Sequence, residues 1–204
     1  MKERSMTSGS ITGAMLRFVG PYLLTIIVQN RYGAVDLLVV GQFATTADVS
    51  AVTIGSQLMS MVTQLVIGFA TGTTVLVGQY YGAKNKERLS VVTGTSATIF
   101  TVFALIITGV FLALHALFVS LMQTPAEAVI PTRQYLFTCA VGIVFIVGFN
   151  IVSSILMGLG DTKTPFIFII VACIINVVLD IILVRYVHLG AFGAAIATTA
   201  AQVG

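Results

Sequence analysis

The sequence predicts an all-α polytopic membrane protein with about six transmembrane helices. Of its 204 residues, 57% are hydrophobic and only 8% are charged, whereas soluble domains carry roughly 25% charged residues. A surface so poor in charge cannot be wetted, which excludes a soluble enzyme, a nucleic-acid-binding domain and a disordered chain. The net charge of +3 does not favour nucleic acid either, because the basic residues are few and scattered.

Long apolar runs predict the individual helices. Each complete run exceeds the ~20 residues that cross a hydrocarbon core as a helix, and none has the length or alternation of a membrane strand. We expect one unit over residues 1–204, a six-helix lobe. The sixth run is too short to span and no basic residue follows it, which favours a fragment of a longer protein. The expected helices cover residues 18–41, 51–81, 91–122, 134–158, 165–187 and 190–204.

The distribution of basic residues predicts the orientation in the membrane. Seven lysines and arginines fall on one side and two, Arg133 and Arg185, on the other. Because the side with more basic residues faces the cytoplasm, the N-terminus and the loop at 82–90 are expected there. Tyr135 falls at an expected membrane interface, and Thr164 is placed to cap the fifth helix.

Three ionisable residues lie inside the expected spans: Arg31, Asp36 and Asp180. Such groups are costly in a bilayer and are functional candidates by default. Each aspartate lies five residues from the outer end of its helix, and is therefore roughly 7 Å below the boundary. Two carboxylates on separate helices are thus expected at one depth. Arg31 lies off the face of Asp36, and either snorkels to the interface or is a counter-ion in a cavity.

Polar neighbours at helical spacing extend this pair into a candidate cation site. Asn176 lies four residues before Asp180 on one helix face, and Thr198 on the sixth helix reaches the depth of Asn176. Together with Asp36 these residues offer carboxylate, carboxamide and hydroxyl oxygens. Such ligands suit a hard cation such as Na⁺, and the carboxylates could instead hold a proton. The competing interpretation is an interhelical hydrogen-bond cluster.

Further polar residues are candidates for the lining of a cavity. Gln29 and Tyr32 share a helix face with Asp36, and Gln57 and Gln64 lie on one face of the second helix. Asn150 lies near the inner end of the fourth helix. Glutamine and asparagine also hold membrane helices together, so packing remains the alternative for each.

The sequence carries no recognisable enzyme motif. Patterns such as HExxH, GxSxG or a Walker loop are absent. The two cysteines, Cys139 and Cys173, lie within apolar runs without metal-binding spacing. We therefore expect neither an enzyme nor a bound cofactor.

Five segments resemble the MATE (multidrug and toxic compound extrusion) transporters, within the wider multidrug and polysaccharide exporter superfamily. Their order and spacing make the resemblance specific, and it runs along nearly the whole chain. The segments are GPYLLTIIVQNRYGAVDLLVVGQF (20–43), GFATGTTVLVGQYYGAKNKERL (68–89), MGLGDTKTP (157–165), INVVLDIILV (175–184) and LGAFGAAIATTAAQ (189–202).

The resemblance implies a fold of twelve helices in two lobes that face each other across a central cavity. Only the first, N-terminal lobe is matched, so a C-terminal lobe is an expected partner, along with the lipid bilayer. The family's N-lobe cation site maps onto Asp36, Asn176, Asp180 and Thr198. The implied function is efflux of cationic amphiphilic drugs or metabolites in exchange for Na⁺ or H⁺, across a bacterial plasma (inner) membrane. The alternatives are a lipid-linked-sugar flippase of the same superfamily and a non-transporting fragment.

Overall fold

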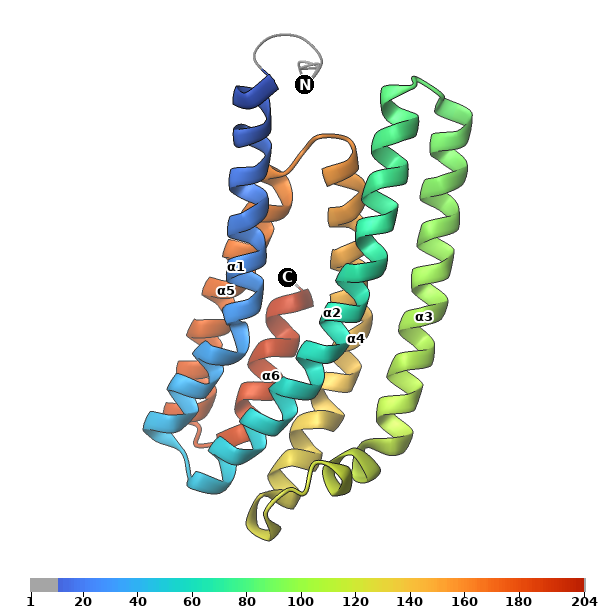
Figure 1. Cartoon of the computed structure of the whole chain (residues 1–204). Coiled ribbons are helices and arrows are strands. Elements are labelled where there is room, and N and C mark those ends of the chain that lie inside the picture. The colour runs from blue at the N-terminus through green and yellow to red at the C-terminus, as the bar shows by residue number, and fades with distance from the viewer. Residues whose placement is uncertain (1–10, 204) are drawn as a thin grey trace.

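The computed structural model describes the backbone of residues 11–203 and the side chains of 19–29 and 33–202. This part of the chain is helical and contains no strand, which confirms the predicted class. The helices pack as one bundle (Figure 1). They are α1 (Ile11–Phe43), α2 (Thr46–Gly82), α3 (Lys86–Leu121), η1 (Ala126–Ala128), α4 (Val129–Gly158), α5 (Lys163–Asp180), η2 (Ile181–Tyr186) and α6 (Gly190–Val203).

The first five α-helices begin two to seven residues before the apolar runs that predicted them, and at α2 and α3 capping residues outside the apolar run set the start. Before α2, Thr45 and Asp48 form a reciprocal capping box. Before α3, the side chain of Asn85 accepts a hydrogen bond from the Arg88 N–H. Hydropathy marks the part of a helix that lies in hydrocarbon, whereas caps mark the whole helix.

The fifth span differs from the prediction of one regular helix over 165–187. Its α-helical part ends at Asp180 and continues as a π-helix, η2. Thr164 is also not the cap of α5. The N-cap residue is Thr162, whose side chain makes no capping hydrogen bond. The preceding residue, Asp161, supplies the acceptor, because its Oδ1 accepts hydrogen bonds from the N–H groups of Lys163 and Thr164.

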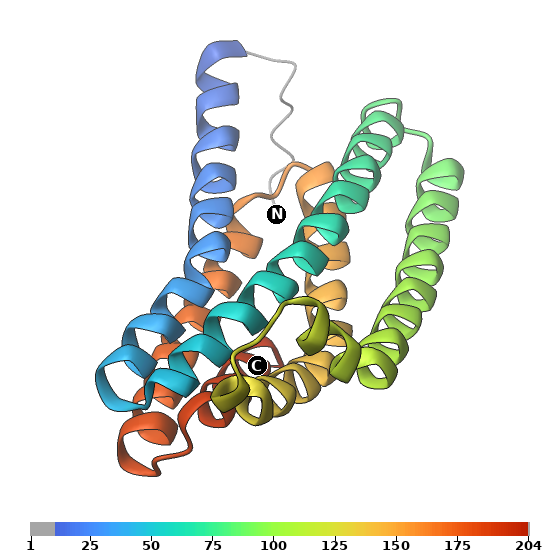
Figure 2. The same cartoon turned by 60° about the horizontal axis from the view of Figure 1, so that its bottom comes forward.

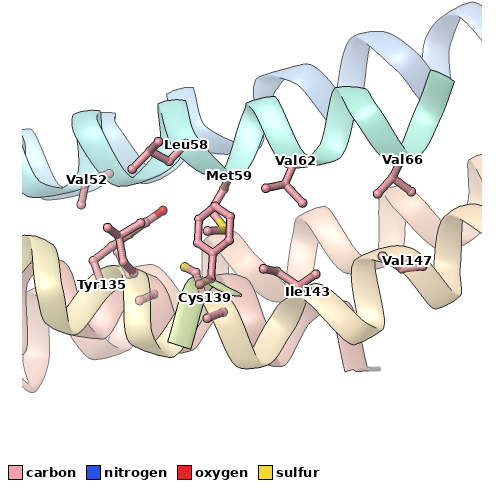
Figure 3. Packing of buried hydrophobic residues seen from close by; sticks show 14 of the residues in the cluster. Val52, Leu58, Met59, Val62, Val66, Tyr135, Cys139, Ile143 and Val147 are labelled. Atoms are coloured by element: carbon pink, nitrogen blue, oxygen red, sulfur yellow. The ribbon is translucent and has the colours of Figure 1, made fainter. Parts of the chain in front are cut away.

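Two views of the bundle show how the helices are grouped. α1 runs beside α5, α2 runs beside α4, and α3 packs on the outside of the α2–α4 pair (Figures 1 and 2). The short α6 lies between these groups and contacts α1, α2, α4 and α5. The apolar core lies mainly between α2 and α4, where Val62 and Val66 face Ile143 and Val147 (Figure 3).

Large apolar side chains also cover the outside of the bundle. On α3, for example, Ile99, Leu105 and Ile106 are each about 60% exposed. Five spans of the described chain are long and apolar enough to cross a membrane, while α6, with 14 residues, is shorter than a span. The chain is therefore an integral membrane protein whose apolar exterior faces lipid.

Candidate functional site: a buried carboxylate pair beside a cavity

The four residues of the predicted cation site come together from three helices. Asp36 of α1 accepts a hydrogen bond at its Oδ2 from the hydroxyl of Thr198 on α6, at 2.8 Å. The Asn176 amide of α5 lies 3.4 Å from the same hydroxyl oxygen, to which its Nδ2 donates. Asp180 lies one turn beyond Asn176 on the same helix, and its buried carboxyl group is a close neighbour of the Asp36 carboxyl group. Asp36, Asn176 and Asp180 are at most 1% exposed.

Most of the oxygen atoms in this cluster lack a donor. Oδ1 of Asp36, Oδ1 of Asn176 and both carboxylate oxygens of Asp180 are buried and accept no hydrogen bond from any residue that the structure describes. Buried polar atoms are nearly always paired, and two adjacent carboxylates repel each other in a medium of low polarity. A cation that several of these oxygens coordinate, or a proton that the two carboxyl groups share, would remove both costs.

A cavity of about 690 Å³ opens beside the cluster. Asp36 and Thr198 line it, whereas Asn176 and Asp180 lie behind them and do not. The carboxylate pair therefore has one member at the cavity wall and one in the interior. A ligand in the cavity would meet Asp36 first.

The cavity brings together four of the five side chains predicted to line it: Gln29, Gln57, Gln64 and Asn150. The Gln29 amide and the Asn150 Oδ1 are 3.5 Å apart, which links α1 to α4 across the cavity. The side chains of Tyr32, the fifth predicted lining residue, and of Arg31 lie outside the described part of the structure.

Sequence reasoning missed Tyr135 as part of the site. This tyrosine, which was expected at a membrane interface, is only 2% exposed and lines the cavity on α4, one turn before Cys139. Its ring packs against Gly55 of α2, where an added Cβ would collide with it. Hydropathy cannot distinguish an interfacial tyrosine from a buried one. The four-residue step from Tyr135 to Cys139 was the available signal, because it places both on one helix face.

The described lining has a consistent chemical character. It combines aromatic and aliphatic side chains with uncharged amides and hydroxyl groups, and Asp36 is its one residue with a formal charge among the side chains described. Pockets of this kind, apolar with a few placed polar groups, are typical binding sites for small molecules. The cavity can therefore hold an amphiphilic small molecule next to the carboxylate pair.

A helical lobe with a lipid-facing exterior, a largely apolar cavity that carries a few polar groups, and ionisable residues buried beside it is the architecture of a membrane transport protein. The family model MatE matches residues 21–182. The chain therefore belongs to the MatE family, whose members are transporters rather than enzymes.

Curated relatives carry names that agree with this assignment. The chain is 31% identical over 199 residues to the "Probable multidrug resistance protein YoeA" of Bacillus subtilis, covering 95% of this chain and 43% of the relative. It is 29% identical over 195 residues to the "DNA damage-inducible protein F" of Escherichia coli, covering 89% of this chain and 40% of the relative. The chain thus spans less than half the length of the relatives it matches.

Solved structures show the same fold. An outward-facing multidrug resistance MATE family transporter superimposes with a TM-score of 0.90 at 25% identity, covering 100% of this chain and 45% of that one. A MATE protein in the bent conformation gives 0.89 at 26% identity, covering 96% and 43%. The six helices described above therefore form one half of the fold seen in these proteins, as the resemblance predicts for an N-terminal lobe.

Proposed function

We propose that this chain is the ion-coupling lobe of a secondary active efflux transporter. It would export organic cations, drugs or metabolites in exchange for Na⁺ or H⁺ by alternating access. The protein would lie in a bacterial plasma membrane with its N-terminus in the cytoplasm, which the excess of basic residues at that end supports. A second lobe would close the cavity over the substrate.

The single observation that carries this proposal is the buried Asp36–Asp180 pair. Four oxygen atoms of the cluster lack donors among the described residues, and Asp36 also borders the cavity. An ion could bind between the two carboxylates, and a cationic substrate could bind in the cavity beside Asp36. These two ligands would compete for the same negative charge. Because a ligand shifts a conformational equilibrium by its differential affinity for the two states, this competition can couple ion entry to substrate release.

The flippase alternative receives less support from the cavity. A lipid-linked pyrophosphate needs cationic side chains, and the described lining contains an aspartate and no lysine or arginine. For one solved relative, a superfamily transporter from Pyrococcus furiosus, "reverse polarity of binding pocket suggests different function". Pocket charge is therefore a useful discriminator among proteins of this fold.

The test is ion-driven transport by the full protein that carries this chain, reconstituted in liposomes. A fluorescent organic cation is loaded, and a Na⁺ or pH gradient is imposed across the membrane. We expect transport to follow one of the gradients and to be lost in Asp36→Asn. Gln57→Asn, which shortens a neutral cavity side chain, is the matched control and should keep the ion dependence. Equal gradient-driven transport by wild type and Asp36→Asn would refute the proposal.

A further inference from the structure

We infer that Asp48 is a positioning residue for the cation site, because it fixes α6, and with it Thr198, against α1. This inference rests on the proposed function and goes beyond it. Asp48 lies in the first turn of α2 and does not line the cavity. Its effect would pass through the N-terminal end of α6.

The carboxylate of Asp48 serves two helices at once. Its Oδ2 accepts hydrogen bonds from the Thr45 hydroxyl at 2.7 Å and the Thr45 N–H at 3.2 Å, which completes the cap of α2. Its Oδ1 accepts the N–H of Ala191 on α6 at 3.0 Å. An ordinary capping box serves only its own helix. Here the same side chain also satisfies one of the free N–H groups at the start of a second helix.

The backbone at the start of α6 fits this contact closely. Gly190 has a φ of +54°, and a Cβ on it would lie 2.5 Å from Oδ1 of Asp48. Both the backbone conformation and the close approach of the carboxylate therefore favour glycine at this position. With any other residue at 190, the carboxylate would be displaced from Ala191.

The contact at Ala191 determines where Thr198 lies. The two residues are seven apart, which is two helical turns, so they lie on the same face of α6 about 10 Å from each other. Ala191, Ala194, Ala195 and Ala197 of α6 are fully buried, so their small side chains let the helix pack closely against its neighbours. The hydrogen bond from the Ala191 N–H to Asp48 fixes the first turn of α6 to the first turn of α2.

The resulting chain of contacts is closed. α1 carries Asp36 and leads through a short turn to Asp48, Asp48 holds Ala191, and α6 carries Thr198 back to the Asp36 carboxylate. Figure 1 shows the α1–α2 turn and the start of α6 at the same end of the bundle. Releasing Asp48 from Ala191 would therefore let the Thr198 hydroxyl drift from Oδ2 of Asp36, although no residue of the cation site has been changed.

The test is a double-mutant cycle between Asp48→Ala and Thr198→Val in the full, purified transporter. The probe is Na⁺, or the proton in Na⁺-free buffer, and the readout is the ion dependence of the thermal unfolding midpoint. We expect each single variant to raise the half-saturating Na⁺ concentration about tenfold, or to move the pH midpoint by about one unit, which is the effect of one hydrogen bond to a charged group. The double variant should bind the ion no more weakly than Thr198→Val alone, because both substitutions act through the same hydrogen bond to Asp36.

Two further variants separate positioning from local capping. Asp48→Asn keeps an acceptor for Ala191 and should restore most of the ion affinity. Thr45→Ala removes the hydroxyl group of the α2 cap but leaves Oδ1 of Asp48 on Ala191, so its ion affinity should stay within about twofold of wild type. Equal losses of ion affinity in Thr45→Ala and Asp48→Ala would overturn the inference. So would a loss of ion affinity in the double variant that equals the sum of the two single losses in free energy.

The outcomes also distinguish this inference from the proposed function. If wild type shows no dependence on Na⁺ or pH, the proposed function fails, while the cycle can still be read from the unfolding midpoints without added ion. A non-additive loss of stability would then support the Asp48–Thr198 coupling alone. A clear ion dependence with additive variants would keep the proposed function and reject the role of Asp48.

Discussion

Aspartates at the helix junctions and aspartates inside the bundle have opposite surroundings. Asp161, before α5, accepts two backbone N–H groups and the Thr164 hydroxyl. Asp48, in the first turn of α2, is satisfied in the same way by Thr45 and Ala191. Inside the bundle, neither oxygen of Asp180 has a donor in the described structure, and Asp36 has one donor for two oxygens. The junction carboxylates complete the fold, whereas the interior pair is left with capacity for a ligand.

The largest expected effect of this difference is on transport. In Asp180→Asn, as in Asp36→Asn, an amide replaces one charge of the pair, so the site can no longer exchange a full charge with the ion. We expect the gradient-driven transport rate to fall at least about 100-fold, in line with the loss of a charged interaction of about 3 kcal/mol. Initial rates in proteoliposomes measure it. A rate within a few-fold of wild type would remove the distinction between interior and junction aspartates.

The second prediction concerns stability, where the two classes should change in opposite directions. At alkaline pH without Na⁺, the interior pair carries charge that no described residue compensates. Replacing Asp180 by asparagine should therefore raise the thermal unfolding midpoint by a few degrees, whereas Asp161→Ala should lower it. Thermal unfolding in detergent measures both variants under one condition. A lower midpoint for Asp180→Asn would show that its carboxylate stabilises the fold.

The third prediction isolates the one hydrogen-bond donor that the described residues offer to the interior pair. Thr198→Val keeps the shape of the side chain and removes the hydroxyl group that contacts Asp36. We expect about a tenfold loss of Na⁺ affinity or a comparable shift in pH dependence. Thr198→Ser, which keeps the hydroxyl group, should remain close to wild type. Identical behaviour of the two variants would mean that the hydroxyl group has no part in ion binding.

The fourth prediction concerns the neutral wall of the cavity. Gln57 lines the cavity from α2, whereas the carboxylate pair lies on α1 and α5. Gln57→Leu should change the KM for the organic cation by about threefold, because it removes one polar contact of about 0.7 kcal/mol. The Na⁺ or pH dependence should not move. A shift of the ion dependence in this variant would show that Gln57 and the carboxylate pair do not act separately.

The smallest effect is expected from the pH dependence of Asp161. Partial burial alone would raise the pKa of this carboxyl group, but hydrogen bonds from Thr164 and Lys163, together with the Lys163 charge, hold the pKa below its usual range. A lowered pKa contributes stability that is present above the usual carboxyl range and is lost as the pH falls through the folded-state pKa. Unfolding midpoints across acidic pH should therefore fall less steeply in Asp161→Asn than in wild type. Equal slopes would contradict this assignment.

Much of the fold could be predicted from the sequence because a bilayer admits few backbone arrangements. Apolar runs of sufficient length had to be helices, and the structure has them in the expected order. The sequence predicted helix starts that lie several residues after the observed ones, since caps such as Thr45 and Asn85 lie outside the apolar runs. The π-helical end of the fifth span left no mark in hydropathy, because its first four residues, 181–184, continue the apolar run without a break.

The candidate site could be predicted to the extent that depth determines contact. Asp36 and Asp180 were expected at one depth and Asn176 and Thr198 at another, one helical turn deeper, and the structure places the four residues together. Depth does not state which helices are neighbours or which way a side chain turns. Tyr135 was therefore expected at the membrane surface, and the link from Asp48 to Ala191 could not be foreseen, because it depends on how two distant junctions meet.

The most direct test of the central claim is to count the protons that exchange when a ligand binds. Isothermal titration of the full transporter with Na⁺, or with the organic cation in Na⁺-free buffer, is repeated in buffers of different ionisation enthalpy. We expect the ligand to displace a fraction of a proton or more from the Asp36–Asp180 pair. This exchange should disappear in the double variant Asp36→Asn/Asp180→Asn. The same proton release from the double variant would contradict the claim that these two carboxyl groups are the coupling site.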